Sequence, residues 1–255
     1  MRILLSNDDG YHAPGLAVLE KIAAQLSDDV WVVAPAEEQS GTGRSLTLTR
    51  PLRVRRFGEK RFAVAGTPTD AVMMGLAEIL DGPPDLILSG VNRGGNLAED
   101  VMYSGTVSAA MEGALAGIRA VALSQRYGAI EPGDDISFAC AEEWGARVLR
   151  PLIDMEWAPR TMVNVNFPAP EAGAVKGVKV VPQGLRNYGR AQFEARTDPR
   201  GFDYYWLKLG SIAPPEDGDT DLAQIAKGWI TVTPLQLDLT HYEALGALRD
   251  AYSAG

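Results

Sequence analysis

The first two thirds of the chain alternate short apolar runs with helical patterns, and this alternation restricts the fold more than any other feature. Apolar runs typical of buried strands lie at residues 2–6, 30–34, 62–65, 85–91, 121–123 and 162–165. Patterns with helical spacing lie at residues 14–26, 67–80, 107–118 and 134–150. Strands joined through helices of this length pair in parallel, with right-handed crossovers. We therefore predict an α/β fold with a doubly wound, mostly parallel sheet.

The sequence clearly indicates where one helix begins. Thr67 suits the N-cap, Pro68 the first helical position and Asp70 the third position. A carboxylate at the third position accepts hydrogen bonds from backbone amides that the first turn leaves free. We predict a capped helix that begins at Pro68.

The last third of the chain changes character, because Pro, Gly and Arg become frequent there. Residues 204–207 and 229–232 have the pattern of strands. We predict a core at residues 1–168 with the functional site, and an extension at residues 169–255. The extension is expected to contain β-hairpins rather than further crossover units, and to return to the core within a single structural unit. The polar, basic residues 186–200 are expected to form a long loop or an exposed arm.

Composition and charge narrow the classes of function. The 255 residues carry a net charge of −9, which argues against a nucleic-acid polymer as partner because such surfaces need clustered Lys and Arg. The single cysteine, Cys140, cannot form an internal disulfide, and the sequence has no zinc-type Cys/His spacing. No apolar segment approaches the ~18 residues of a membrane span. We expect a cytoplasmic protein without a membrane partner.

Polar residues follow three of the predicted strands, at residues 7–10, 36–44 and 92–96. Ligands of open parallel sheets bind beyond the carboxyl ends of the strands, so these loops are candidates for one site. Their carboxylates and neutral oxygens suit Mg²⁺ or Mn²⁺. A turn that prefers Asp and Gly also explains the motif NDDG on its own. A cation would in addition relieve the repulsion between the adjacent Asp8 and Asp9.

A second candidate feature precedes the most regular helical pattern. Ser104, Gly105 and Thr106 stand at its start, where Ser or Thr is a good N-cap. The free amides and partial positive charge of a helix N-terminus also form a ready phosphate site. Capping and phosphate binding are both consistent with these residues. A metal and a phosphate site at one edge of the sheet would together indicate phosphoryl chemistry.

Several other enzyme classes lack their motifs in this sequence. It contains no GxxxxGK[ST] loop, no GxGxxG fingerprint and no GxSxG elbow. His12 and His241 are the only histidines, which argues against Ser-His-Asp hydrolysis and against multi-histidine zinc sites. His12 lies close to the acidic pair, where a structural loop role is favoured over contact with substrate.

A series of longer motifs, spread from residue 6 to about residue 240, resembles the SurE family, the stationary-phase survival proteins. The motifs are SNDDGYHAPG, SGTGRSLTLTRPLR, AGTPTDAV, SGVNRGGNLAEDVMYSGTVSAAMEG, DPRGFDYYWL and GWITVTPLQLDLT. They follow the order of the family, and several are long and specific. The resemblance implies a Rossmann-like core with C-terminal hairpins that exchange between subunits, giving a homodimer or homotetramer.

The resemblance also implies an activity and a set of site residues. The expected enzyme is a 5′-nucleotidase that releases phosphate from nucleoside 5′-monophosphates, with 3′-nucleotides and short polyphosphate as further substrates. The expected cofactor is one divalent metal ion per subunit, Mg²⁺ or Mn²⁺. The positions that match the metal ligands of the family are Asp8, Asp9, Ser40 and Asn92. The positions that match its phosphate-binding residues are Asn96, Ser104, Gly105 and Thr106.

We hypothesise metal-assisted hydrolysis of a phosphomonoester, with Asp8 and Asp9 as the catalytic carboxylates. One of the two would orient or deprotonate the attacking water, and a covalent aspartyl-phosphate route is an alternative. A nucleotide-binding regulator without turnover is a rival hypothesis. A metal-dependent deacetylase or glycosyl-group enzyme is a third, but such enzymes generally use histidine ligands.

Overall fold

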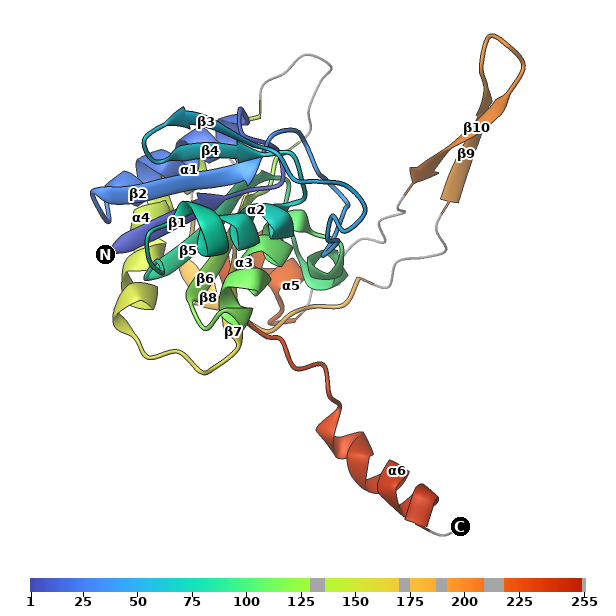
Figure 1. Cartoon of the computed structure of the whole chain (residues 1–255). Helices are drawn as coiled ribbons and strands as arrows, with labels where there is room; N and C mark the ends of the chain where they lie inside the picture. The colour runs from blue at the N-terminus through green and yellow to red at the C-terminus, as the bar shows by residue number, and fades with distance from the viewer. Residues whose placement is uncertain (129–135, 170–174, 187–191, 209–217, 254–255) are drawn as a thin grey trace.

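The computed structural model describes residues 1–128, 136–169, 175–186, 192–208 and 218–253 (Figure 1). Within this part of the chain, nine strands form one sheet in the order β3-β4-β2-β1-β5-β6-β7-β11-β8. These strands are β1 (Arg2–Ser6), β2 (Asp29–Pro35), β3 (Val54–Gly58), β4 (Arg61–Val64), β5 (Leu86–Arg93), β6 (Arg119–Gln125), β7 (Thr161–Phe167), β8 (Val178–Val180) and β11 (Ile230–Gln236). A separate antiparallel hairpin consists of β9 (Gln192–Thr197) and β10 (Asp203–Lys208).

Strand β1 lies inside the sheet and pairs in parallel with β2 on one side and with β5 on the other. From β2 the sheet continues to β4, and from β5 it continues through β6 to β7, all in parallel. The strand order therefore reverses between β1 and β5. The predicted mostly parallel α/β sheet is confirmed, and the reversal point is where such sheets bind their ligands.

Helices cover both faces of this sheet (Figure 1). Helices α1 (Pro14–Ala24) and α4 (Ala139–Asp154) share one apolar core with Ile3 and Leu5 of β1. Helices α2 (Pro68–Met74) and α3 (Gly105–Leu115) share the other core with Leu4. Successive residues of a strand point to opposite faces, so a strand covered on both sides is apolar throughout. This burial explains the continuous apolar runs in the sequence.

The start of α2 confirms the predicted cap. The Thr67 hydroxyl accepts from the Asp70 amide at 3.1 Å, and the Asp70 carboxylate accepts from the Thr67 amide at 2.8 Å. The helix ends at Met74 and continues as a π-helical turn, η1 (Gly75–Ile79), close to the predicted end at residue 80. Helix α4 begins at Ala139, and residues 134–135 of its predicted start lie outside the described residues.

The C-terminal third agrees with the prediction only in part. The predicted strand at residues 204–207 is β10 and forms a hairpin, but its partner β9 lies within residues 186–200, where a long loop or an exposed arm was expected. Strands β8 and β11 pair in parallel, with helix α5 (Asp221–Ala226) before β11. The expectation of hairpins rather than a crossover unit was therefore wrong here. Strand β8 has three residues and α5 has six, too few for a period to be visible in the sequence.

The hairpin β9–β10 and the helix α6 (Tyr242–Ser253) extend away from the layered body of the molecule (Figure 1). Helix α6, which was not predicted, has no buried residue. Among the described helices, none combines the length and the apolar character needed to cross a membrane.

Candidate active site at the carboxyl edge of the sheet

The motif Asn7-Asp8-Asp9-Gly10 forms a turn directly after β1, at the reversal point of the sheet. The Asn7 side-chain amide donates to the Gly10 carbonyl at 2.8 Å. The turn leaves Asp8 only 4% exposed, whereas Asp9 is half-buried. The turn and the metal interpretations of this motif are therefore compatible, because the turn itself presents two carboxylates at one edge.

Asp8 lies against the start of α3. The Thr106 hydroxyl donates to Asp8 Oδ1 across 98 residues of sequence. Gly105 makes this approach possible, since a Cβ at residue 105 would lie 2.7 Å from the Cβ of Asp8 and 3.0 Å from its Oδ2. Burial raises the pKa of Asp8 to about 6, the Asp9 charge adds to the rise, and the Thr106 hydroxyl and amide oppose it. The first turn of α3 thus interacts with a carboxylate as well as capping itself.

Asp9 is held from the end of the neighbouring strand. The Arg93 amide of β5 donates to Asp9 Oδ2 at 3.0 Å. Burial raises the pKa of Asp9, the charge of Glu38 adds to the rise, and the amide and charge of Arg93 oppose it. Two adjacent carboxylates with raised pKa values form a locally anionic site that favours a bound cation.

The loop after β2 reaches the same edge, but its serine is exposed. The Gln39 amide donates to the Asp8 carbonyl at 2.7 Å, which fixes the loop against the NDDG turn. Ser40 is exposed, and its hydroxyl donates to Glu38 Oε1 at 3.0 Å. Gly43 donates to the carbonyl of Tyr103 at 3.2 Å, just before α3. The backbone of this loop therefore joins the two parts of the site.

The two asparagines after β5 have different surroundings. Asn92 is 9% exposed, and its Nδ2 donates to the Gly94 carbonyl at 2.8 Å. Asn96 is 8% exposed, and its Nδ2 donates to the Ser124 hydroxyl of β6 at 2.9 Å. Ser104 caps α3 by accepting from the Val107 amide at 3.1 Å, and its own hydroxyl proton stays available to an acceptor.

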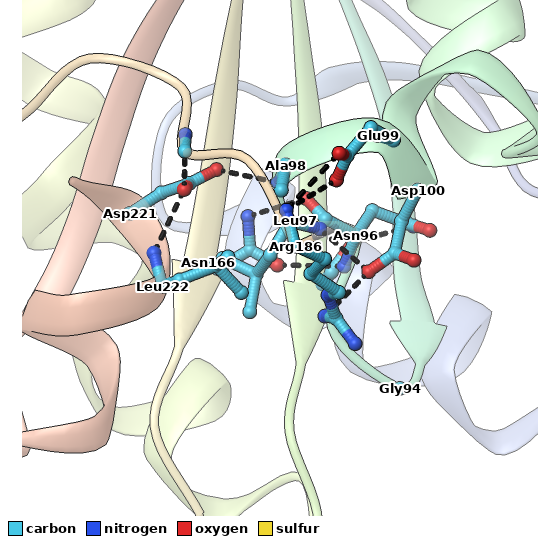
Figure 2. Close-up of polar contacts among 12 residues, drawn as sticks. Gly94, Asn96, Leu97, Ala98, Glu99, Asp100, Asn166, Arg186, Asp221 and Leu222 are labelled. Atoms are coloured by element: carbon cyan, nitrogen blue, oxygen red, sulfur yellow. Dashed lines mark hydrogen bonds and ion pairs between the residues drawn. The ribbon is translucent and has the colours of Figure 1, made fainter. Parts of the chain in front are cut away.

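Two side chains of β7 fix the backbone of Asn96, and Figure 2 shows one of them, Asn166. Asn166 accepts from the Asn96 amide at 2.8 Å and donates to its carbonyl at 3.0 Å. Asn164 donates to the same carbonyl at 2.8 Å. Both asparagines are fully buried, and they alternate with apolar residues along β7. Their alternation along β7 was the signal that could have identified them.

The residues that follow Asn96 form a short 3-10 helix, η2 (Ala98–Met102), which the C-terminal part of the chain holds in place (Figure 2). The buried Asp221 carboxylate of α5 accepts from the Ala98 amide at 2.8 Å and from the Gly184 amide at 2.7 Å. Arg186 donates through its backbone to Glu99 and through its guanidinium to Asp100 at 2.6 Å. Sequence reasoning missed Asp221, which stands 123 residues from its partner Ala98.

The donor set fits a hard divalent cation. Asp8 and Asp9 each have one carboxylate oxygen bonded to the protein, which leaves Asp8 Oδ2 and Asp9 Oδ1 as further acceptors. Asn92 donates through its nitrogen and so leaves its Oδ1 as a neutral ligand. The described residues contain no cluster of three or more His, Cys, Asp or Glu that could hold a metal ion. A cation here would therefore bind two carboxylates and complete its shell with neutral oxygens and water.

Comparison with known proteins identifies the family of the chain. The family model described as survival protein SurE matches residues 3–190. The 5′-nucleotidase SurE of Rhizorhabdus wittichii is 65% identical over 99% of this chain and all of that protein. The 5′-nucleotidase SurE of Erythrobacter litoralis is 53% identical with the same coverage. The crystal structure of the SurE protein from Aquifex aeolicus superposes with a TM-score of 0.83 at 37% identity, covering 99% of this chain and all of that chain. The chain therefore belongs to the SurE family.

Proposed function

We propose that this protein is a 5′-nucleotidase that hydrolyses nucleoside 5′-monophosphates to nucleoside and phosphate. One observation carries the proposal: the buried Asp8, with a pKa raised to about 6, meets the start of α3 through Thr106 at the reversal point of the sheet. The 65% identity to a 5′-nucleotidase SurE supports the substrate class. The 3′-nucleotides and short polyphosphate are proposed as further substrates.

Family membership implies a divalent metal cofactor, and we propose Mg²⁺ or Mn²⁺, one ion per subunit. Asp8, Asp9, Ser40 and Asn92 are the residues that would hold it. A bound divalent ion polarises a phosphoryl oxygen and lowers the pKa of bound water. Ser40 would bind through its hydroxyl oxygen, which has acceptor capacity beyond its bond to Glu38.

The chain's own residues would position the phosphate and the water. Ser104 can donate its hydroxyl proton to a phosphoryl oxygen, and Gly105 and Thr106 present the positive end of α3. Asn96 is held rigidly by Asn164 and Asn166, which suits a residue that orients substrate. The carboxylate of Asp8 or Asp9 would accept the proton of the attacking water.

The direct test is release of phosphate from AMP in the presence of Mg²⁺ or Mn²⁺, with EDTA as the control. We expect turnover that EDTA abolishes, and a loss of about a hundredfold or more in Asp9→Asn with an unchanged fold by circular dichroism. Saturable AMP binding without phosphate release would favour the regulator hypothesis. Parallel assays with 3′-AMP and tripolyphosphate would decide the further substrates.

We also propose a cytoplasmic homodimer or homotetramer in which residues 169–255 make the subunit contacts. Aromatic side chains of the hairpin support this proposal, since Phe193, Tyr205 and Trp206 are 64%, 62% and 59% exposed. Apolar side chains exposed in this way are typical of interaction surfaces.

A further inference from the structure

The segment that follows β6 carries a cation and an aromatic ring that the proposed chemistry leaves unused. Arg126 is half-buried and Tyr127 is 43% exposed. In the described part of the chain, no hydrogen bond or ion pair involves the guanidinium of Arg126 or the hydroxyl of Tyr127. The backbone here is fixed, because the Arg126 amide donates to the Phe167 carbonyl at 2.9 Å.

Both side chains lie against the loop that carries Asn92 and Asn96. A Cβ on Gly94 would lie 3.4 Å from Cε1 of Tyr127 and 4.0 Å from Nδ2 of Asn92. The tyrosine ring and the amide of Asn92 therefore flank the same point of the loop. A Cβ on Gly95 would lie 2.9 Å from Cγ of Arg126 and 3.4 Å from Oδ1 of Asn166. The stem of the arginine thus runs beside the residues that fix Asn96.

Partial burial of a cation without an acidic partner is costly unless a ligand supplies the opposite charge. Burial lowers the pKa of Arg126, and the like charge of Arg186 lowers it further. Arg186 has a carboxylate partner in Asp100, at 2.6 Å. Among the described residues, Arg126 is therefore a half-buried cation at this edge that is available to an anion, in a chain whose net charge is −9.

We propose that Arg126 and Tyr127 form a substrate subsite in which Arg126 contacts the phosphate and Tyr127 stacks on the base of the nucleotide. This inference rests on the proposed 5′-nucleotidase function. A nucleotide carries an anionic phosphate that can pair with the arginine and a flat aromatic base that can stack on the tyrosine. The Tyr127 ring is 43% exposed, so part of its surface is open to a base. Stacking accepts every base because each has a π-face.

The test compares AMP with ribose 5-phosphate, which has the same phosphate and sugar but no base. Tyr127→Ala should raise KM for AMP roughly 5- to 50-fold and leave KM for ribose 5-phosphate within about twofold. Tyr127→Phe should retain the wild-type values, since it keeps the ring. Arg126→Gln should raise KM for both substrates, roughly tenfold, with kcat within about twofold.

Matched controls come from exposed side chains far from the site in the fold. Met155→Ala directly after α4, where the methionine is 51% exposed, and Arg150→Gln on α4 should leave KM for both substrates unchanged. Equal effects of Tyr127→Ala on AMP and ribose 5-phosphate, or no effect on either, would overturn the stacking role. An unchanged KM in Arg126→Gln would overturn the phosphate contact. A wild-type protein that hydrolyses neither substrate would instead contradict the proposed 5′-nucleotidase function.

Discussion

The ionised Asp8 carboxylate destabilises the folded, metal-free protein more than an exposed carboxylate would. Its pKa rises from 3.8 to about 6 because burial disfavours the charged form, so folding is penalised while the group is ionised. The penalty is largest above pH 6 and disappears as the pH falls below the unfolded value near 3.8. A side chain with this cost and a free oxygen is suited to a ligand that brings positive charge.

The variant Asp8→Asn should therefore be more stable than the wild type when both lack metal. At pH 8 in EDTA we expect a gain of about 2 kcal/mol, which shrinks as the pH falls from 6 to 4. Urea unfolding at pH 8, 6 and 4 measures the difference, and the exposed Asp219→Asn is the control. Equal stabilities at every pH would contradict the assigned cost of Asp8. With Mn²⁺ added, only the wild type should gain stability.

The variant Gly105→Ala should disturb the site because its methyl group has no space. The new Cβ would lie 2.7 Å from the Cβ of Asp8, so the carboxylate or the first turn of α3 must shift. We expect a loss of about tenfold or more in kcat/KM for AMP, and weaker Mn²⁺ binding by calorimetry. Gly82→Ala, where the added Cβ would lie in ordinary contact with the Arg2 side chain at 3.6 Å, should leave both values unchanged. Wild-type activity in Gly105→Ala would show that Asp8 does not need this close contact.

The positions of the site residues could be predicted from the sequence, whereas their contacts could not. Polar residues directly after an apolar run mark the carboxyl edge of the sheet, so Asp8, Asp9 and Asn92 could be assigned to it. The bond from Thr106 to Asp8 spans 98 residues and depends on how α3 packs. Arg126 and Tyr127 belong to no recognisable motif in the sequence. Their place beside the loop that carries Asn92 and Asn96 follows from their contacts near Gly94 and Gly95 in the structure.

At the scale of elements, the C-terminal α5 supports a loop of the N-terminal core. Asp221 accepts from the Ala98 and Gly184 amides and from Leu222 at 2.7 Å, so one buried carboxylate joins η2, the segment after β8 and α5. The strand patterns of the core were visible in the sequence because they are apolar and regular. The short β8 and α5 were not, because tertiary contacts such as those of Asp221 determine them more than local preference does.

The variant Asp221→Asn should loosen η2 and with it the segment that leads to Ser104. The substitution replaces one carboxylate oxygen with an NH₂ group, which cannot accept a hydrogen bond from a backbone N–H. At least one of the three hydrogen bonds is therefore lost. We expect a loss of about 2 to 4 kcal/mol in the free energy of unfolding and a lower kcat for AMP. Asp219→Asn, two residues away and exposed, is the matched control. Unchanged stability in Asp221→Asn would contradict the anchoring role.

At the scale of the whole molecule, the hairpin β9–β10 and α6 extend from the body and expose apolar side chains (Figure 1). The hairpin contains two strands only, and an isolated two-stranded hairpin is marginally stable in water. Tyr205 and Trp206 are exposed on it, and α6 buries no residue. Elements of this kind gain stability when they pack on another surface, which supports the proposed homo-oligomer.

Light scattering coupled to size exclusion should therefore give a mass of two or four chains of 27.4 kDa each. The double variant Tyr205→Ser with Trp206→Ser removes two aromatic contacts of the hairpin and should shift this mass toward the monomer. Arg200→Ser, in the connection between the same two strands, is the control and should keep the oligomer. Because Asp8, Asn92 and Thr106 all lie in residues 1–168, the monomeric variant should retain AMP hydrolysis unless the partner subunit completes the site. A wild-type mass of one chain would contradict the homo-oligomer, and activity lost together with the oligomer would indicate an active site shared between subunits.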